Sequence, residues 1–145
     1  MSNIQEEIKL NASKVDAYLN SYFKNQNSNS MLYEAMKYGL FSGGKMIRSY
    51  LVHAACKVFD IKEKDYIPIA AAIECVHSYS LIHDDLPSMD NDDFRRGKES
   101  THKAYGEFTA ILAGSSLLTM AFEIISDHNF KIPDEKKIKI IHALS

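Results

Sequence analysis

The amino-acid sequence predicts an all-α protein, and two observations support this fold class. Apolar side chains recur every three or four positions along most of the 145 residues, which is the spacing that gives a helix one buried face. No segment shows convincing two-residue alternation bounded by turn residues, so we expect no β-strands. The composition, with 46% apolar and 25% charged residues, is that of an ordinary globular protein with a core.

The first part of the chain is expected to form three helices. The first helix carries an apolar stripe made of Ile4, Ile8, Ala12, Val15 and Leu19. A polar connector is expected at residues 21–30, a second helix at 30–41 and a third helix at 46–59. The second helix is expected to stop at Gly43 and Gly44, because glycine suits the conformation at a helix C-terminus.

The remaining chain is expected to form three more helices. Pro68 suits the first turn of a fourth helix, where its missing N–H is not needed. This helix is expected to end near Asp85, because Pro87 disfavours its continuation. A charged loop follows, then a fifth helix at 106–126 and a sixth that begins near Pro133.

The apolar spacing of the sixth helix continues to Ser145 without a capping glycine or a trailing loop. We therefore interpret the sequence as a fragment that ends inside a helix.

Charge and hydropathy favour a cytoplasmic protein that is not inserted in a membrane. A net charge of -2 gives no general attraction to nucleic acid or to an anionic membrane. The N-terminus lacks the pattern of a signal peptide, and the apolar stretch 111–122 is too short to span a bilayer. Cys56 and Cys75 lie in apolar surroundings without metal-ligand spacing, which is typical of buried thiols in a reducing compartment.

The strongest chemical signal is an acidic cluster with five aspartates among the ten residues 84–93. Such carboxylates repel one another unless water or cations compensate their charge. A calcium loop that starts at Asp90 would need glycine at its sixth position, where the chain has Arg95. Mg²⁺ fits better, because it binds through a few carboxylates, several waters and substrate phosphate oxygens. A solvated helix end with an acidic loop remains the alternative.

The spacing of the aspartates indicates which of them bind the metal. Neighbouring helix residues point about 100° apart, so Asp84 and Asp85 do not both face one ion. A chain break at Pro87 lets the backbone return Asp90 toward Asp84. We therefore predict Asp84 and Asp90 as Mg²⁺ ligands and Asp85 as a supporting carboxylate, and we assign all three to the catalytic group.

Two basic elements accompany the acidic cluster. The segment Arg95-Arg96-Gly97-Lys98 follows it directly and is either charge balance on a loop or a clamp for phosphate oxygens. Lys45 and Arg48 lie on one face of the third helix's first turn, where free backbone N–H groups also favour an anion. His77 precedes Asp84 by two helical turns, although a single histidine on a helix is more often a core residue. Two basic elements indicate two phosphorylated substrates.

Taken in order, these motifs resemble the trans-isoprenyl diphosphate synthases. The matching segments are Gly43-Gly44-Lys45-x-x-Arg48, Glu74-Cys75-Val76-His77, Asp84-Asp85-x-x-x-x-Asp90 and Arg95-Arg96-Gly97-Lys98. The resemblance implies an all-α helical bundle of the isoprenoid synthase type, usually a homodimer. It also implies that residues 1–145 are the N-terminal part of a single domain of this type and contain about its first six helices. It also implies a Mg²⁺-dependent prenyltransferase that condenses isopentenyl diphosphate with an allylic diphosphate.

The resemblance also implies roles for individual residues. Those implied to bind the diphosphate of isopentenyl diphosphate are Lys45, Arg48, His77 and Arg96. Asp84 and Asp90 would hold Mg²⁺ on the allylic diphosphate, which the catalytic residue Arg95 also contacts. Met46 and Ser49 depart from the arginine and proline that the family usually has at these positions.

The residues before the aspartate motif imply a product length. In this family they form the floor of the cavity that holds the growing chain, and here they are Tyr79 and Ser80. An aromatic residue five positions before Asp84 is similar to the bacterial enzymes that make farnesyl diphosphate. A geranylgeranyl-forming enzyme remains the alternative, since Tyr79 is the only residue that favours the shorter product.

One family element does not occur in these 145 residues. The family needs a second aspartate-rich motif on a later helix, and the sequence contains none. We therefore expect the 145-residue chain alone to be inactive. A non-catalytic subunit that keeps the fold remains a competing interpretation, and a terpene cyclase is disfavoured by the basic residues of the isopentenyl site.

Overall fold

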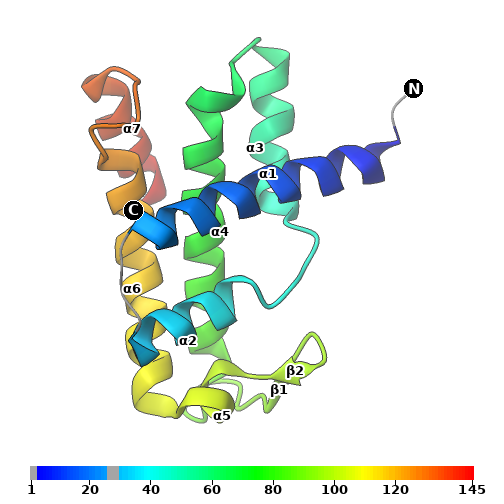
Figure 1. Ribbon diagram of the computed structural model, residues 1–145, viewed down its shortest axis with the longest axis vertical. Helices are drawn as coiled ribbons and strands as arrows, with labels where there is room; N and C mark the ends of the chain where they lie inside the picture. The colour runs from blue at the N-terminus through cyan, green and yellow to red at the C-terminus, as the bar shows by residue number, and fades with distance from the viewer. Residues whose placement is uncertain (1–2, 26–29) are drawn as a thin grey trace. The chain divides into compact units, whose positions relative to one another are not determined.

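The computed structural model describes residues 3–25 and 30–145, and within them the protein is almost entirely helical (Figure 1). The elements in chain order are α1 (Ile4–Asn25), α2 (Met31–Leu40), α3 (Ile47–Val58), α4 (Glu63–Asp84), β1 (Phe94–Arg95), β2 (Lys98–Glu99), α5 (Thr101–Tyr105), α6 (Glu107–Ser126) and α7 (Asp134–Leu144). The all-α class is confirmed. The described residues contain seven helices, where about six are expected. The expectation of no β-strands is wrong in one place, because a two-stranded hairpin lies in the charged loop.

The chain divides into two compact units, which are described separately. The first unit consists of Met1–Asn25, Lys45–Glu74 and Met120–Ser145. The second unit consists of Gln26–Gly44 and Cys75–Thr119. The unit boundaries fall inside α4 and inside α6, so these two helices contribute to both units.

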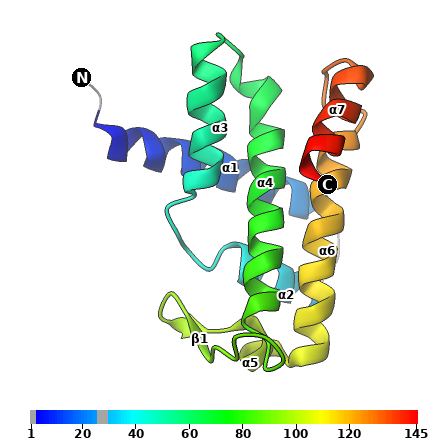
Figure 2. The same ribbon diagram turned by 180° about the vertical axis from the view of Figure 1, so that it is seen from behind.

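In the first unit α1 lies across α3, as both views of the ribbon show (Figures 1 and 2). The buried part of α1 is centred on Val15 and Leu19, while Ile4 at its start is exposed. The predicted connector at 21–30 is wrong in its first half, because α1 continues to Asn25. Residues 26–29 of that connector lie outside the described residues.

In the second unit α2 packs against α5. The ring of Tyr38 meets the ring of Tyr105 edge-on at 5.3 Å, and the Tyr38 hydroxyl donates to the Glu99 carbonyl oxygen over 2.9 Å. Gly39 allows a close approach, because a Cβ there would lie 2.4 Å from Cδ1 of Ile82. These contacts tie α2 to the hairpin and to the end of α4.

Helix boundaries differ from the prediction at two places. The side chain of Ser30 accepts from the Tyr33 N–H at the start of α2, but α2 ends at Leu40 with Phe41 as its C-cap, so Gly43 and Gly44 lie in the connection that follows. The other difference concerns Pro68, which is the sixth residue of α4 and not part of its first turn. The acidic residues of the first turn favour a helix start at Glu63, one turn earlier than proline alone indicates.

Helix α6 is longer and more apolar than the stretch 111–122 suggested. It has 20 residues and is, among the described residues, the one helix long and apolar enough to cross a membrane by length and composition. Half of its apolar window is buried inside the protein, with Leu117 and Ile124 fully buried. A helix in a protein core has the same length and composition, so this property carries no argument for a membrane span.

Candidate functional site

The acidic cluster begins where α4 ends, and its backbone turns back on the helix. The Asp90 N–H donates to the Asp84 carbonyl oxygen over 2.8 Å. The N–H groups of Met89 and Asn91 both donate to the Leu86 carbonyl oxygen, over 2.9 and 3.1 Å. The return of Asp90 toward Asp84, expected from the break at Pro87, is therefore confirmed for the backbone.

The side chains of Asp84 and Asp90 are accessible, the first half-buried and the second exposed. Among the residues that the structure describes, neither carboxylate takes part in a side-chain hydrogen bond or a salt bridge. The described ranges also contain no group of three or more His, Cys, Asp or Glu side chains that could hold a metal ion. Two unpaired carboxylates on one returning turn fit a Mg²⁺ ion whose other ligands are waters and phosphate oxygens.

Asp85 has a different environment, because it is 3% exposed and paired with Arg95. The Nε of Arg95 donates to the two carboxylate oxygens of Asp85 over 3.0 and 3.3 Å, and its Nη2 donates to the same carboxylate. Nη2 also reaches Asp92 at 3.3 Å. These hydrogen bonds to Asp85 raise the pKa of Arg95 above its ordinary value. Asp85 therefore fixes the position of the Arg95 side chain.

The basic segment after the aspartates is a β-hairpin. Phe94 pairs with Glu99 and Arg95 pairs with Lys98, which leaves Arg96 and Gly97 as a two-residue turn. Both turn residues have positive φ, 55° and 80°, the geometry whose twist matches two antiparallel strands. Strands of two residues are too short to show alternation in the sequence, which is why the pattern missed them.

The guanidinium of Arg96 lies against the backbone of Gly44. A Cβ at Gly44 would lie 2.3 Å from Nη1 and 2.6 Å from Cζ of Arg96, and the φ of +134° also favours glycine. Gly97 has a positive φ as well, but a Cβ there would meet nothing within 4 Å. The glycine of the first basic motif therefore makes room for the arginine of the second, inside the second unit.

His77, Tyr79 and Ser80 follow one another on α4 and are all half-buried. The Ser80 hydroxyl donates to the His77 carbonyl oxygen over 2.8 Å, a bond within the helix. The Tyr79 ring meets the imidazole of His83 edge-on, with centroids 4.7 Å apart and planes at 71°. The sequence pattern did not single out His83.

Lys45 and Arg48 belong to the first unit, whereas the other predicted site residues belong to the second. Both side chains are exposed, and they stand at the start of α3. The N-cap residue Met46 makes no side-chain capping bond and has a left-handed φ of 46°. The first turn of α3 therefore needs another acceptor for its free N–H groups.

That acceptor is Glu74 of α4, a carboxylate that is only 4% exposed. Its Oε1 accepts the Ser49 N–H over 2.9 Å. The Ser49 hydroxyl donates to the Met46 carbonyl oxygen over 2.8 Å and accepts from Nδ2 of Asn11 over 3.1 Å. In the sequence, Glu74 is part of one of the family motifs. A polar residue among the buried alanines of α4 was the available signal for its capping role.

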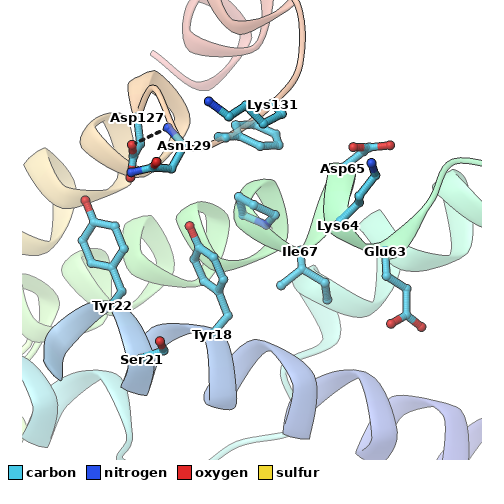
Figure 3. A pocket seen from close by; sticks show the side chains of 12 residues that line it. Tyr18, Ser21, Tyr22, Glu63, Lys64, Asp65, Ile67, Asp127, Asn129 and Lys131 are labelled. Carbon is cyan, nitrogen blue, oxygen red and sulfur yellow. Dashed lines mark hydrogen bonds between the residues drawn. The ribbon is translucent and has the colours of Figure 1, made fainter. Parts of the chain in front are cut away.

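A separate cavity of about 660 Å³ lies within the first unit (Figure 3). Tyr18 and Tyr22 of α1 project into it, beside the start of α4 and the segment 127–131. Burial, and then a hydrogen bond to Glu123, raise the pKa of Tyr22. The cavity contains none of the predicted site residues. Its charged residues are of both signs, so they favour no single ligand charge.

Comparison with known proteins identifies relatives of the whole described fold. A family model described as polyprenyl synthetase matches residues 29–145. The chain is 42% identical over 131 residues to a farnesyl diphosphate synthase of Bacillus subtilis, covering 90% of this chain and 44% of the relative. It is 43% identical over 148 residues to a farnesyl diphosphate synthase of Geobacillus stearothermophilus, covering 100% of this chain and 50% of the relative.

A solved structure supports the same relationship. The crystal structure of a geranyltransferase from Legionella pneumophila matches with a TM-score of 0.86 and 39% identity, over 93% of this chain and 48% of that one. The chain thus spans about half the length of the curated relatives it matches. The family model covers well over half of the chain, and the helical fold agrees with that of the solved relative. This chain belongs to the polyprenyl synthetase family.

Proposed function

We propose that this chain is part of a prenyltransferase that condenses isopentenyl diphosphate with dimethylallyl or geranyl diphosphate to give farnesyl diphosphate. The observation that carries the proposal is the returning turn, which brings the backbone of Asp90 to Asp84 and leaves both carboxylates unpaired among the described residues. Relatives that are 42% and 43% identical and are named farnesyl diphosphate synthase support the choice of product.

In the proposed site, one set of residues binds the allylic diphosphate and another set binds the diphosphate of isopentenyl diphosphate. Asp84 and Asp90 would hold Mg²⁺ together with oxygens of the allylic diphosphate, and the metal would neutralise charge on the leaving diphosphate. Nη1 of Arg95 makes no hydrogen bond to the described residues, so it is free to contact that diphosphate while Nε and Nη2 hold Asp85. The residues proposed to bind the diphosphate of isopentenyl diphosphate are Lys45, Arg48, His77 and Arg96.

The proposed reaction would use this placement of charge. The carbon–oxygen bond of the allylic diphosphate breaks, and its electron pair leaves with the diphosphate. The double bond of isopentenyl diphosphate attacks the allylic cation, and the proton released on forming the new double bond passes to the departing diphosphate. One opposite charge at 4 Å contributes about 4 kcal/mol at an effective dielectric near 20, so several cations are needed. The protein contributes position, charge and exclusion of water.

We also infer the context in which the reaction takes place. The 145 residues are proposed to be the N-terminal part of a single domain in a cytoplasmic homodimer. They contain no second aspartate-rich motif, so the chain alone is proposed to bind diphosphates without turnover. Steady product formation by this chain alone would contradict that inference.

The test uses the complete protein encoded by the reading frame. It is incubated with Mg²⁺, isopentenyl diphosphate and dimethylallyl diphosphate, and the products are sized by mass spectrometry. A fifteen-carbon product supports the proposal, and a twenty-carbon product replaces it with a geranylgeranyl-forming enzyme. A folded protein without any product supports a non-catalytic subunit instead. Asp90→Asn is the matched variant, expected to lower kcat strongly without unfolding, because Asp90 is exposed.

A further inference from the structure

We propose that His83 is a positioning residue that sets the length of the prenyl product by holding Tyr79 in place. The proposal rests on the proposed prenyltransferase function and on the floor role that the family resemblance implies for Tyr79. It adds a residue that acts through Tyr79 and does not itself touch the growing chain. All the residues involved belong to the second unit.

The imidazole of His83 is held on two sides. On one side the Tyr79 ring meets it edge-on, at a centroid distance of 4.7 Å and an interplanar angle of 71°. On the other side Nε2 lies 3.1 Å from the Ile111 carbonyl oxygen of α6. A carbonyl oxygen has no proton to donate, so Nε2 of His83 is the donor in this contact.

Gly114 provides the space that the imidazole occupies. A Cβ at Gly114 would lie 2.5 Å from both Cδ2 and Nε2 of His83, closer than atoms of a packed interior approach. Gly114 is buried, and it lies three residues after Ile111 on the same face of α6. This face of α6 therefore has a gap at Gly114 beside the Ile111 carbonyl oxygen. The imidazole of His83 occupies the gap and hydrogen-bonds to the carbonyl oxygen.

This arrangement limits the motion of Tyr79. Tyr79 and His83 are four residues apart, so their side chains are neighbours on one face of α4. A tyrosine on a helix can change its χ1 rotamer unless a neighbour blocks it. The imidazole is fixed to α6 and therefore keeps the phenol ring in one orientation. A fixed ring is a rigid end wall for a chain cavity, whereas a mobile ring yields to a longer chain.

The contacts give a clear test in the complete protein. His83→Ala removes the support, and Gly114→Ala on α6 pushes the imidazole out of its gap without touching Tyr79 directly. Each variant is expected to raise the share of products longer than fifteen carbons by about tenfold, the order of discrimination that a pocket wall provides. His83→Phe keeps a ring and is expected to lie between the wild type and His83→Ala.

The combination of variants separates positioning from general loosening. Gly114→Ala acts through the imidazole, so adding it to His83→Ala is expected to change the products no further. Thr119→Ala is the matched control on α6, because its hydroxyl donates to the Ser115 carbonyl oxygen of the same helix over 3.0 Å. The control is expected to keep the wild-type products. A shift in product length with little change in the KM of isopentenyl diphosphate is the signature of this role.

The outcomes distinguish the inference from the function on which it rests. Suppose that the wild type makes farnesyl diphosphate and that both single variants also make only this product, whatever their turnover rate. In that case His83 does not position Tyr79 as the floor of the chain cavity. If Gly114→Ala shifts the products equally with and without His83, the effect bypasses His83 and the inference is also overturned. If the folded wild type makes no prenyl product, the proposed function itself fails.

Discussion

The start of α3 and the end of α4 both present charged side chains at a helix terminus, but they are held by different kinds of interaction. At the start of α3, the acceptor for the Ser49 N–H is Glu74, a residue 25 positions later in the chain. At the end of α4, the backbone of Asp84 and Asp90 is joined over six positions by one hydrogen bond. The first region depends on packing between helices and the second on a local turn.

This difference predicts where substitutions act. A polar group that caps a helix from another element contributes to the stability of the unit, because its loss leaves a buried donor unsatisfied. A surface turn with exposed carboxylates contributes little to stability and is free to serve binding. The one exception in the second region is the buried pair of Asp85 and Arg95, and the first prediction addresses it.

Asp85→Ala is expected to have the largest effect on stability. It leaves the partly buried guanidinium of Arg95 without its main partner, and breaking such a pair costs about 3 kcal/mol of unfolding free energy. Chemical denaturation of the complete protein measures it. Asp92→Ala is the control, because its exposed contact at 3.3 Å is worth well under about 1 kcal/mol. Equal losses for the two variants would contradict the difference in burial.

Glu74→Met is expected to have the next largest effect, because it removes the acceptor of the Ser49 N–H. The loss is expected to be about 2 kcal/mol of unfolding free energy, together with a higher KM for isopentenyl diphosphate if Arg48 binds it. Ser49→Pro removes the donor N–H, so the same Glu74→Met change is expected to cost less in that background. A double-mutant cycle on denaturation midpoints measures the coupling, and zero coupling would exclude the capping role.

Gly44→Ala tests the contact with Arg96 in the second unit. Both Gly44 and Gly97 have positive φ, so alanine at either position costs about 1 kcal/mol of strain. Only the Gly44 variant also displaces the guanidinium of Arg96. We therefore expect Gly44→Ala to raise the KM for isopentenyl diphosphate more than Gly97→Ala does. Steady-state kinetics at a fixed concentration of the allylic substrate measure this KM for both variants, and equal increases would contradict the role of the Gly44–Arg96 contact.

The smallest effect concerns Asp16 and its dependence on pH. Burial, and then the charge of Glu74, raise the pKa of Asp16, and its Oδ1 has no hydrogen-bond partner among the described residues. A raised pKa in the folded state means that the fold binds this proton more tightly than the unfolded chain does. The resulting stability is present below the ordinary carboxyl pKa and is lost as the pH rises through the folded value.

Asp16→Asn removes that loss. The variant is expected to be more stable than the wild type at neutral pH, because the chain no longer carries a partly desolvated charge near Glu74. The advantage is expected to shrink as the pH falls to the ordinary carboxyl pKa and below. Thermal unfolding of both proteins at several pH values between acidic and neutral measures this difference in stability. A difference that does not depend on pH would rule out titration of Asp16 as its cause.

The sequence predicted the local structure correctly where it depends on contacts between residues that are close in the chain. The apolar spacing located the helices, because each helix is held by bonds over four positions. The break at Pro87 predicted the return of Asp90 for the same reason. The errors also have local causes: Pro68 was assigned to the first turn of α4, although the acidic residues before it start the helix at Glu63. The hairpin was missed because its strands have two residues each.

The sequence by itself determined the helical class, the acidic turn and the family motifs, since all of these are written in short segments. Only the tertiary structure decided the partners: Asp85 with Arg95, Gly44 with Arg96, Glu74 with Ser49, and His83 with Gly114. A motif shows which chemical groups are present, but it does not show which of them contact or hydrogen-bond to one another. That depends on how helices pack, and packing joins residues far apart in the chain through contacts that no local pattern records.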